Sequence, residues 1–223
     1  DIKNAKTKIL KVKSIPNFNP ENYQSARVFV TVRDGTRVPV SLLYRKDFKR
    51  RKSSPLLLSG YGAYGLSSDA SFTSYPLSYV DKGFVYAIAH VRGGSEMGRA
   101  WYDEGRLQKK LNTFYDFIDV AEELIRLGFA SRGHVYAEGA SAGGLLMGAI
   151  ANMRPDLFHA LSADVPFVDV LTTMLDKNIP LTVGEYEEWG NPNTKADYEY
   201  MRKYSPYDNV KAQNYPHMLI TGA

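Results

Sequence analysis

The sequence predicts an α/β fold in which a mostly parallel sheet is flanked by helices and carries an antiparallel hairpin at its N-terminal edge. Apolar and polar residues alternate over 28–32 and over 38–42, on either side of the tight-turn pair Asp34-Gly35, a pattern typical of a β-hairpin. The short continuous apolar runs 56–58 and 84–89 are typical of strands buried on both faces of a parallel sheet. Helices should then alternate with these strands, because parallel strands need crossover connections.

The first 24 residues precede this pattern. Residues 6–13 nearly alternate lysine with apolar side chains and predict a lone polar strand, while Pro16 and Pro20 mark a connector. A strand without a sequence-adjacent partner indicates a remnant of a preceding unit. We therefore expect residues 1–24 to be such a remnant and linker, and residues 25–223 to form one domain.

Helices and strands alternate along the rest of the chain, after a basic loop at 46–52. Residues 114–125 carry apolar side chains at helical spacing, with Asn112 or Thr113 as a cap and Gly128 as a stop. Residues 145–152 predict a second helix, which ends before Arg154-Pro155. Short strands are expected at 134–138, 160–165 and 218–221.

Composition limits the function classes. The chain has 223 residues, 44% of them hydrophobic, which suits one full-sized core, and no apolar run approaches the length of a membrane span. It has no cysteine, which excludes disulfides and thiolate metal sites. Residues 1–52 carry a net charge of +10 and the remainder −6, so no basic stripe for nucleic acid runs through the predicted domain. We expect a cytoplasmic protein without nucleic-acid or membrane partners and without a cofactor.

The strongest chemical signal is the G-x-S-x-G motif Gly139-Ala140-Ser141-Ala142-Gly143. It falls between a predicted strand and a predicted helix, the context of a nucleophile elbow, which presents a strained serine above a sheet edge in the α/β-hydrolase fold. Ser141 is therefore the candidate nucleophile. The alternative is a glycine-rich turn in which the serine has no catalytic role.

A serine nucleophile needs donors for the developing oxyanion. The N–H of Ala142, which opens the following helix, is one candidate. The second donor should come from the loop after the third strand, where Tyr61 lies between glycines in the segment 59–65. Its hydroxyl could approach a substrate, although a flexible loop with surface tyrosines would have the same composition.

The base and acid of a catalytic triad are harder to find. This fold supplies them after the serine, in the order Asp or Glu, then His. His134, His159 and His217 precede or open their predicted strands and so belong to the wrong edge of the sheet. His90 is at the correct edge but upstream of the serine, and Asp164 could be an acid in another arrangement or cap its strand. The chain stops just after the last predicted strand, so we expect a domain truncated before the last strand and helix.

An acidic segment follows Asp164 and includes Glu185, Glu187 and Glu188. Such a run is usually a solvated face. Here Phe167 and aromatic residues 186 and 189 are interleaved with the acids, and carboxylates beside aromatic rings can bind a long cationic side chain. Both interpretations remain open from composition.

Several motifs together resemble the oligopeptidase B group of the prolyl oligopeptidase family of serine peptidases, from about Tyr23 to the end of the chain. The motifs are Gly60-Tyr61-Gly62, residues 90–98, 112–114, 139–144 and 165–170, and Gly184-Glu185-Tyr186-Glu187-Glu188-Trp189-Gly190-Asn191-Pro192. The resemblance implies cleavage of short peptides after Arg or Lys by an α/β-hydrolase domain that is gated by an N-terminal seven-bladed β-propeller of the same chain. Residues 1–13 would then be the remnant of that propeller.

The resemblance also implies roles for individual residues. Ser141 would be the nucleophile, with Tyr61 and Ala142 as the oxyanion donors. Glu185 and Glu187 would bind the basic side chain before the scissile bond, with Phe167 as a wall of that pocket. Asp69 would favour a second basic residue, but Ser71 stands where a second acid is expected. The triad Asp and His would follow Ala223, which leaves residues 1–223 inactive by themselves.

Two other functions remain possible on this evidence. An esterase or lipase would use the same serine motif without a role for Glu185 and Glu187. A catalytically inactive α/β domain could serve as a binding module.

Overall fold

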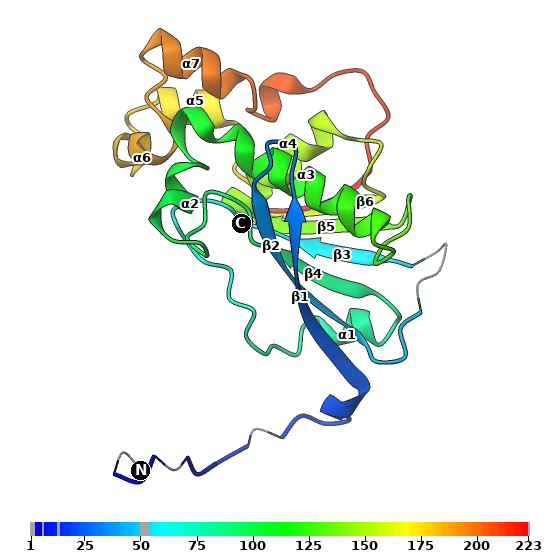
Figure 1. Cartoon of the computed structure of the whole chain (residues 1–223). Helices are drawn as coiled ribbons and strands as arrows, with labels where there is room; N and C mark the ends of the chain where they lie inside the picture. Colours follow the sequence, from blue (N-terminus) through cyan, green and yellow to red (C-terminus); the bar gives the residue numbers. More distant parts are fainter. Residues whose placement is uncertain (1–2, 6, 13, 50–53, 223) are drawn as a thin grey trace.

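The computed structural model describes residues 3–5, 7–12, 14–49 and 54–222. Within these residues, seven strands form one mixed sheet in the order β1-β2-β4-β3-β5-β6-β7 (Figure 1). The strands are β1 (Tyr23–Thr31), β2 (Arg37–Arg45), β3 (Leu56–Ser59), β4 (Val85–Ala89), β5 (Val135–Ala140), β6 (Ala160–Asp164) and β7 (His217–Thr221). The predicted α/β class with an antiparallel N-terminal hairpin is confirmed.

The N-terminal hairpin forms as the alternating pattern predicts. Strands β1 and β2 pair antiparallel, and β2 pairs antiparallel with β4. In the turn, the N–H of Thr36 donates to Oδ1 of Asp34 at 3.0 Å, and Gly35 has φ +86°. From β4 onward the pairing is parallel through β3, β5, β6 and β7. The carboxyl ends of these five strands therefore meet at one edge.

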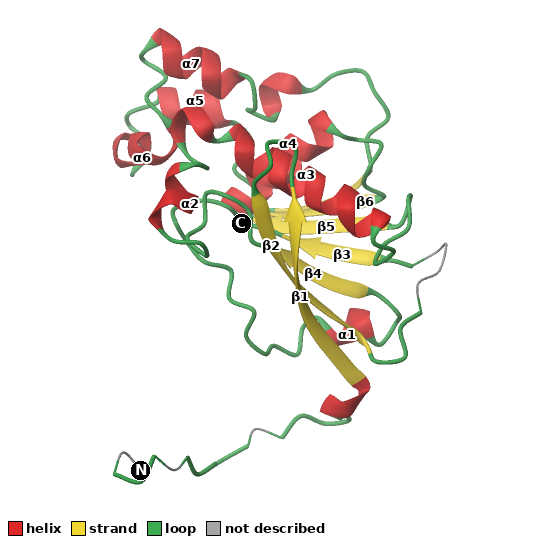
Figure 2. Ribbon diagram, in the orientation of Figure 1, coloured by secondary structure: helices red, strands yellow, loops and turns green. Residues whose placement is uncertain are grey.

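Helices are α1 (Leu77–Val80), α2 (Arg99–Asp103), α3 (Leu111–Arg126), α4 (Ala142–Met153), α5 (Val170–Leu175), α6 (Thr182–Trp189) and α7 (Lys195–Arg202). Helix α4 packs on β5 and β6 and against α3, which also contacts the hairpin. Helices α5, α6 and α7 gather at one end of the molecule (Figure 2). None of the helices in the described ranges is long and apolar enough to span a bilayer.

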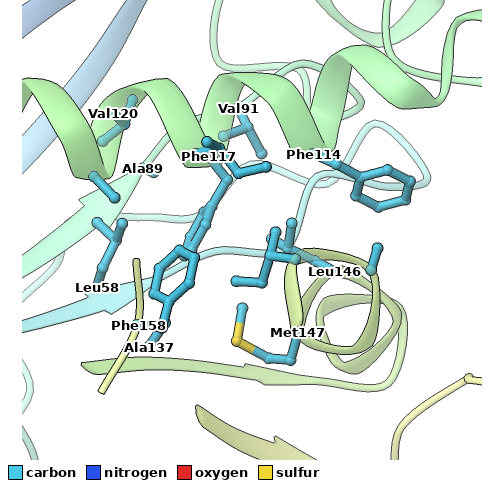
Figure 3. Close-up of a cluster of buried hydrophobic side chains, with 14 of the residues drawn as sticks. Leu58, Ala89, Val91, Phe114, Phe117, Val120, Ala137, Leu146, Met147 and Phe158 are labelled. Atoms are coloured by element: carbon cyan, nitrogen blue, oxygen red, sulfur yellow. The ribbon is translucent and has the colours of Figure 1, made fainter. Parts of the chain in front are cut away.

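The core lies between α3, α4 and the sheet. Phe114 and Phe117 from α3 and Leu146 from α4 are completely buried and belong to one cluster with Leu58 and Ala137 from the strands (Figure 3). The apolar stripe that predicted the 114–125 helix is therefore the face that covers the sheet. Burial of each such side chain stabilises the fold by roughly 1.5–3 kcal/mol.

Two local predictions are wrong. Residues 7–12 form no strand, and Ile9 and Leu10 are 75% and 87% exposed, because no strand among the described residues pairs with this segment. Residues 6 and 13 of that prediction, and 50–52 of the basic loop, lie outside the described residues. Helix α3 begins at Leu111, so neither Asn112 nor Thr113 is its cap. Asn112 instead donates to the carbonyl of Glu104 at 2.9 Å and Thr113 to that of Arg92 at 2.7 Å.

The turn after β4 touches the loop after β3. The N–H of Gly65 donates to the carbonyl of Gly93 at 2.9 Å. Gly93 has φ +100°, and a Cβ placed on it would overlap the carbonyl oxygen of Gly62. A glycine at position 93 is thus what allows the two turns to lie in contact.

Gly93→Ala should lower the free energy of unfolding by about 3 kcal/mol or more, because backbone strain at positive φ and overpacking each cost about 1–3 kcal/mol. Gly83→Ala is the matched control, since Gly83 has φ +92° but open space at the Cβ position. It should show only the strain, about 1–2 kcal/mol. Denaturant unfolding of the two variants checks this, and equal losses would contradict the close contact.

Candidate active site

Ser141 lies in a sharp turn between β5, which ends at Ala140, and α4, which begins at Ala142. Its backbone has φ 55° and ψ −113°, a strained conformation for a residue with a side chain, and its side chain is exposed. The surrounding backbone holds this turn: the Ser141 N–H donates to the carbonyl of Asp164 at 2.9 Å. Its carbonyl accepts from the N–H groups of Leu145 and Phe167, both at 3.1 Å. The elbow geometry predicted from the motif is present.

The turn is pressed against the loop after β3. A Cβ on Gly143 would lie 2.7 Å from the carbonyl oxygen of Gly60, so a larger residue would push the two segments apart. The N–H of Gly60 donates to the carbonyl of Glu138 on β5 at 3.4 Å, which extends the parallel pairing of β3 with β5. The pairing of β3 with β5 therefore positions Tyr61 next to Ser141.

Tyr61 and Ala142 lie beside Ser141. Burial raises the pKa of the Tyr61 phenol, and the neighbouring Ser141 hydroxyl opposes this shift to a smaller extent. The phenol therefore stays protonated at neutral pH and can donate a hydrogen bond. Ala142 is buried at the first position of α4, where backbone N–H groups have no partner within the helix. An oxyanion that formed beside Ser141 would need hydrogen-bond donors of this kind.

The side-chain contacts of His90 are with residues other than Ser141. It is 2% exposed, its Nε2 lies 2.8 Å from Oγ of Ser41 on β2, and its Nδ1 lies 3.5 Å from Oε1 of Glu96. This histidine belongs to a buried polar cluster on the hairpin side of the sheet.

The other three histidines lie at the opposite edge, as the sequence predicted. His134 precedes β5, His159 precedes β6 and His217 opens β7. The rings of His159 and His217 pack at 5.5 Å. Among the described residues, no histidine is therefore placed to take the proton of Ser141.

Asp164 ends β6 and is exposed, and its carboxylate accepts from the hydroxyl of Thr221 on the neighbouring strand. It lines a polar cavity of about 400 Å³ together with Tyr75 and Glu138. Glu138 accepts from the Tyr75 hydroxyl at 2.6 Å, and burial raises the pKa of this carboxyl. In the described part of the chain, no three metal-binding side chains come together in a metal-binding arrangement.

Glu185 lies in an aromatic cage on α6. Its Oε2 accepts from the Tyr64 hydroxyl at 2.7 Å and from Nε1 of Trp189 at 3.1 Å. The Trp189 ring packs against Phe167 at 5.4 Å and edge-on against Tyr64 at 5.5 Å. Because the Phe167 N–H donates to the Ser141 carbonyl, the same segment contacts both the nucleophile turn and the cage. The structure thus brings Glu185 and Phe167 together.

Glu188 is an acid whose importance the sequence does not reveal. It is 3% exposed and accepts from the N–H of Tyr64 at 2.9 Å and from the Tyr102 hydroxyl at 2.5 Å. Glu187 is exposed, and only its carbonyl accepts, from Arg106 at 3.3 Å. Helical spacing is the sequence signal that distinguishes the buried Glu188 from the exposed Glu187. Glu188 follows Glu185 by three residues and shares its helix face, whereas Glu187 lies on another face.

Asp69 is exposed and lies apart from this cage. It lines a groove of about 670 Å³ with Ser71 and Phe72, against the face of β1, β2 and β4. No hydrogen bond or ion pair between described residues joins Asp69 to Glu185 or Ser141.

Comparisons with known proteins agree with this geometry. Residues 70–223 match the model of the Prolyl oligopeptidase family. The chain is 51% identical over 219 residues to dipeptidyl aminopeptidase BI of Pseudoxanthomonas mexicana, covering 98% of this chain and 30% of that protein. The chain thus spans about 30% of the length of this curated relative.

Solved structures superpose closely. Oligopeptidase B from Leishmania major has a TM-score of 0.90 at 52% identity, over 92% of this chain and 29% of that one. Oligopeptidase B from Trypanosoma brucei, in a closed form with covalently bound antipain, has a TM-score of 0.89 at 55% identity, over the same shares. The likeness therefore covers nearly the whole of this chain but a limited part of each relative.

Proposed function

Because this chain belongs to the prolyl oligopeptidase family of serine peptidases, we propose that it is the α/β-hydrolase catalytic domain of a longer oligopeptidase that hydrolyses short peptides after Arg or Lys. The observation that carries this proposal is the pairing of a strained, exposed Ser141 with the Tyr61 hydroxyl, beside a cage that holds Glu185. Ser141 and Tyr61 would carry out acyl transfer, and the cage around Glu185 would bind a cation.

In the proposed reaction, Oγ of Ser141 attacks the scissile carbonyl carbon and a histidine base takes its proton. The carbonyl oxygen becomes an oxyanion, which the Tyr61 hydroxyl and the Ala142 N–H stabilise. The histidine then protonates the leaving amine, and water hydrolyses the acyl-enzyme. We place the histidine and its acid after Ala223, because this fold uses the order serine, acid, histidine and no described histidine contacts Ser141.

Specificity for Arg or Lys is assigned to Glu185. Its carboxylate is partly buried, and its hydrogen-bond donors, Tyr64 and Trp189, are both neutral. Buried carboxylates are normally paired with a cation, and Glu185 has no ion-pair partner among the described residues. A substrate guanidinium or ammonium would supply the missing charge, with Phe167 and Trp189 flanking its aliphatic stem.

The remaining assignments follow the family resemblance. Glu187 would add charge near the mouth of the pocket from its exposed position. Asp69 would bind a second basic side chain, weakly, because Ser71 carries no charge. We also propose that a β-propeller of the same chain precedes residue 25, and that the protein is cytoplasmic.

Tyr61→Phe should lower kcat of the intact enzyme by two to three orders of magnitude with little change in KM, because loss of one oxyanion donor costs about 3–4 kcal/mol in the transition state. Steady-state kinetics with an arginyl amide measures this. Tyr198→Phe is the control, since Tyr198 lies on α7 and is 36% exposed. An unchanged kcat in Tyr61→Phe would reduce Tyr61 to a loop residue.

Glu185→Gln should lower kcat/KM for Arg and Lys substrates, because it leaves a desolvated cation unpaired. The loss corresponds to about 2–5 kcal/mol of binding free energy in the transition state. Glu187→Gln, on the same helix but exposed, should cost under about 1 kcal/mol. Neutral substrates should change little in either variant. The substrates are amides with a blocked N-terminus. An enzyme that releases dipeptides needs a free amino end on its substrate, so cleavage of these amides also shows that the enzyme has no such requirement.

Equal, minor losses of kcat/KM for basic and neutral substrates in Glu185→Gln would contradict the assigned specificity. They would not contradict catalysis by Ser141. Hydrolysis of simple acyl esters without any preference for arginyl amides would favour an esterase instead.

A further inference from the structure

A lysine is buried between the two halves of the proposed site. Lys110 precedes α3, is 1% exposed and forms no salt bridge with the described residues. Burying an ammonium without a carboxylate partner is unfavourable, and its position at a helix N-terminus adds repulsion from the helix dipole. Such a residue is costly to keep, which indicates that its charge serves a purpose.

The contacts of Lys110 point to both functional groups. Its Nζ donates to the carbonyl of Gly62 at 2.5 Å, one residue after the oxyanion tyrosine, and to the carbonyl of Gly105 at 3.2 Å. The same Nζ lies 5.1 Å from the centre of the Trp189 ring, a cation–π distance. Trp189 is the residue whose indole N–H holds Glu185. One ammonium therefore touches both the loop that carries Tyr61 and the indole that orients the specificity acid.

We propose that Lys110 is a positioning residue of the peptidase, whose ammonium fixes the Tyr61 loop and the Glu185 cage in one arrangement. This inference rests on the proposed function, since it assigns Lys110 a part in oxyanion stabilisation and in binding the basic side chain. Lys110 does not touch the reacting atoms; it acts through Gly62 and Trp189.

The charge of Lys110 can be removed by pH. Burial lowers its pKa to about 8, and the only opposing influence is the nearby carboxylate of Glu188. The elements around it also carry the carboxyls of Asp103, Glu185 and Glu187, the exposed cations of Arg99 and Lys109, and several tyrosines, five of which have a raised pKa. Burial raises the pKa of each of these five tyrosines, which are Tyr61, Tyr64, Tyr102, Tyr200 and Tyr204. Lys110 is the group in contact with both Gly62 and Trp189 whose pKa is lowered to about 8, so a loss of positive charge at these two contacts just above pH 8 would come from its ammonium.

The effect on stability has the opposite sign. The pKa of Lys110 is lower in the folded chain than the 10.5 of an exposed lysine, so between about 8 and 10.5 the unfolded chain binds more protons. The contribution of this group to stability thus increases with pH in that window. A loss of activity there would not be caused by unfolding at Lys110.

The test compares Lys110→Met with Lys109→Met in the intact enzyme, by kcat and KM for arginyl and neutral amides from pH 7 to pH 10 and by thermal unfolding. Lys109 is the matched control, because it is the adjacent lysine, its side chain is 52% exposed and it pairs with Glu104. Arginyl substrates keep their charge over this range. Lys110→Met should lower kcat for both substrates by about tenfold to a hundredfold at pH 7, as a displaced oxyanion donor would, and raise KM further for the arginyl amide. Its kcat should no longer fall above pH 8, whereas kcat of the wild type and of Lys109→Met should.

A folded Lys110→Met enzyme with wild-type kcat would overturn the proposal. If the variant fails to fold, the wild-type profile decides: a kcat for the arginyl amide that is flat from pH 7 to pH 10 would also overturn it. An inactive wild type would refute the proposed function itself, and this inference with it. An active wild type that is matched by Lys110→Met refutes only the role of Lys110.

Discussion

The close approach of two backbone turns determines the geometry of the site. The serine turn can be strained only because its amide and carbonyl are held by β6 and by the segment that follows it, and it can meet the Tyr61 loop only because Gly143 has no side chain. On its other side that loop touches Gly93, in the turn after β4. Parallel pairing of β3 with β4 and β5 sets these three turns side by side at one sheet edge, so the sheet itself supplies the precision that catalysis needs.

Electrostatics links this edge to the acidic helix α6. Glu188 is buried and ties α6 to the Tyr64 backbone and to Tyr102, and Glu185 on the same face accepts from Tyr64 and Trp189. Among the described residues, the hydrogen-bond donors of both carboxylates are neutral. A carboxylate without a cationic partner has an uncompensated negative charge, whereas pairing with an arginine would neutralise that charge. The aromatic rings around it limit access of water and strengthen its attraction for a cation. The fold thus places one fully buried acid, Glu188, and one partly buried acid, Glu185, within a single helical turn.

Much of this could be predicted from the sequence, because the informative patterns are local. Alternation and an Asp-Gly turn predict the hairpin, and strand-turn-helix context predicts Ser141. What failed depends on distant partners. Residues 7–12 have a strand pattern but no strand to pair with, and Thr113 looks like a helix cap but bonds the carbonyl of Arg92. The burial of Lys110 and Glu188 follows from packing of α3 and α6 against the short turn Leu107–Lys109 and from the bond of Tyr102 to Glu188, which no local pattern encodes. The separate positions of Asp69 and Glu185 likewise arise from tertiary structure.

The proposed function requires Ser141 to be an activated nucleophile beside a pocket for a basic side chain. The most direct measurement is covalent labelling of the intact enzyme with two serine-reactive phosphonates, one bearing a guanidinium side chain and one a neutral side chain of similar length. Peptide mapping by mass spectrometry identifies the labelled residue, and the time course gives each rate. The account predicts label on Ser141 from both probes, with the guanidinium probe reacting much faster. Label on another residue, or equal rates for the two probes, would contradict it.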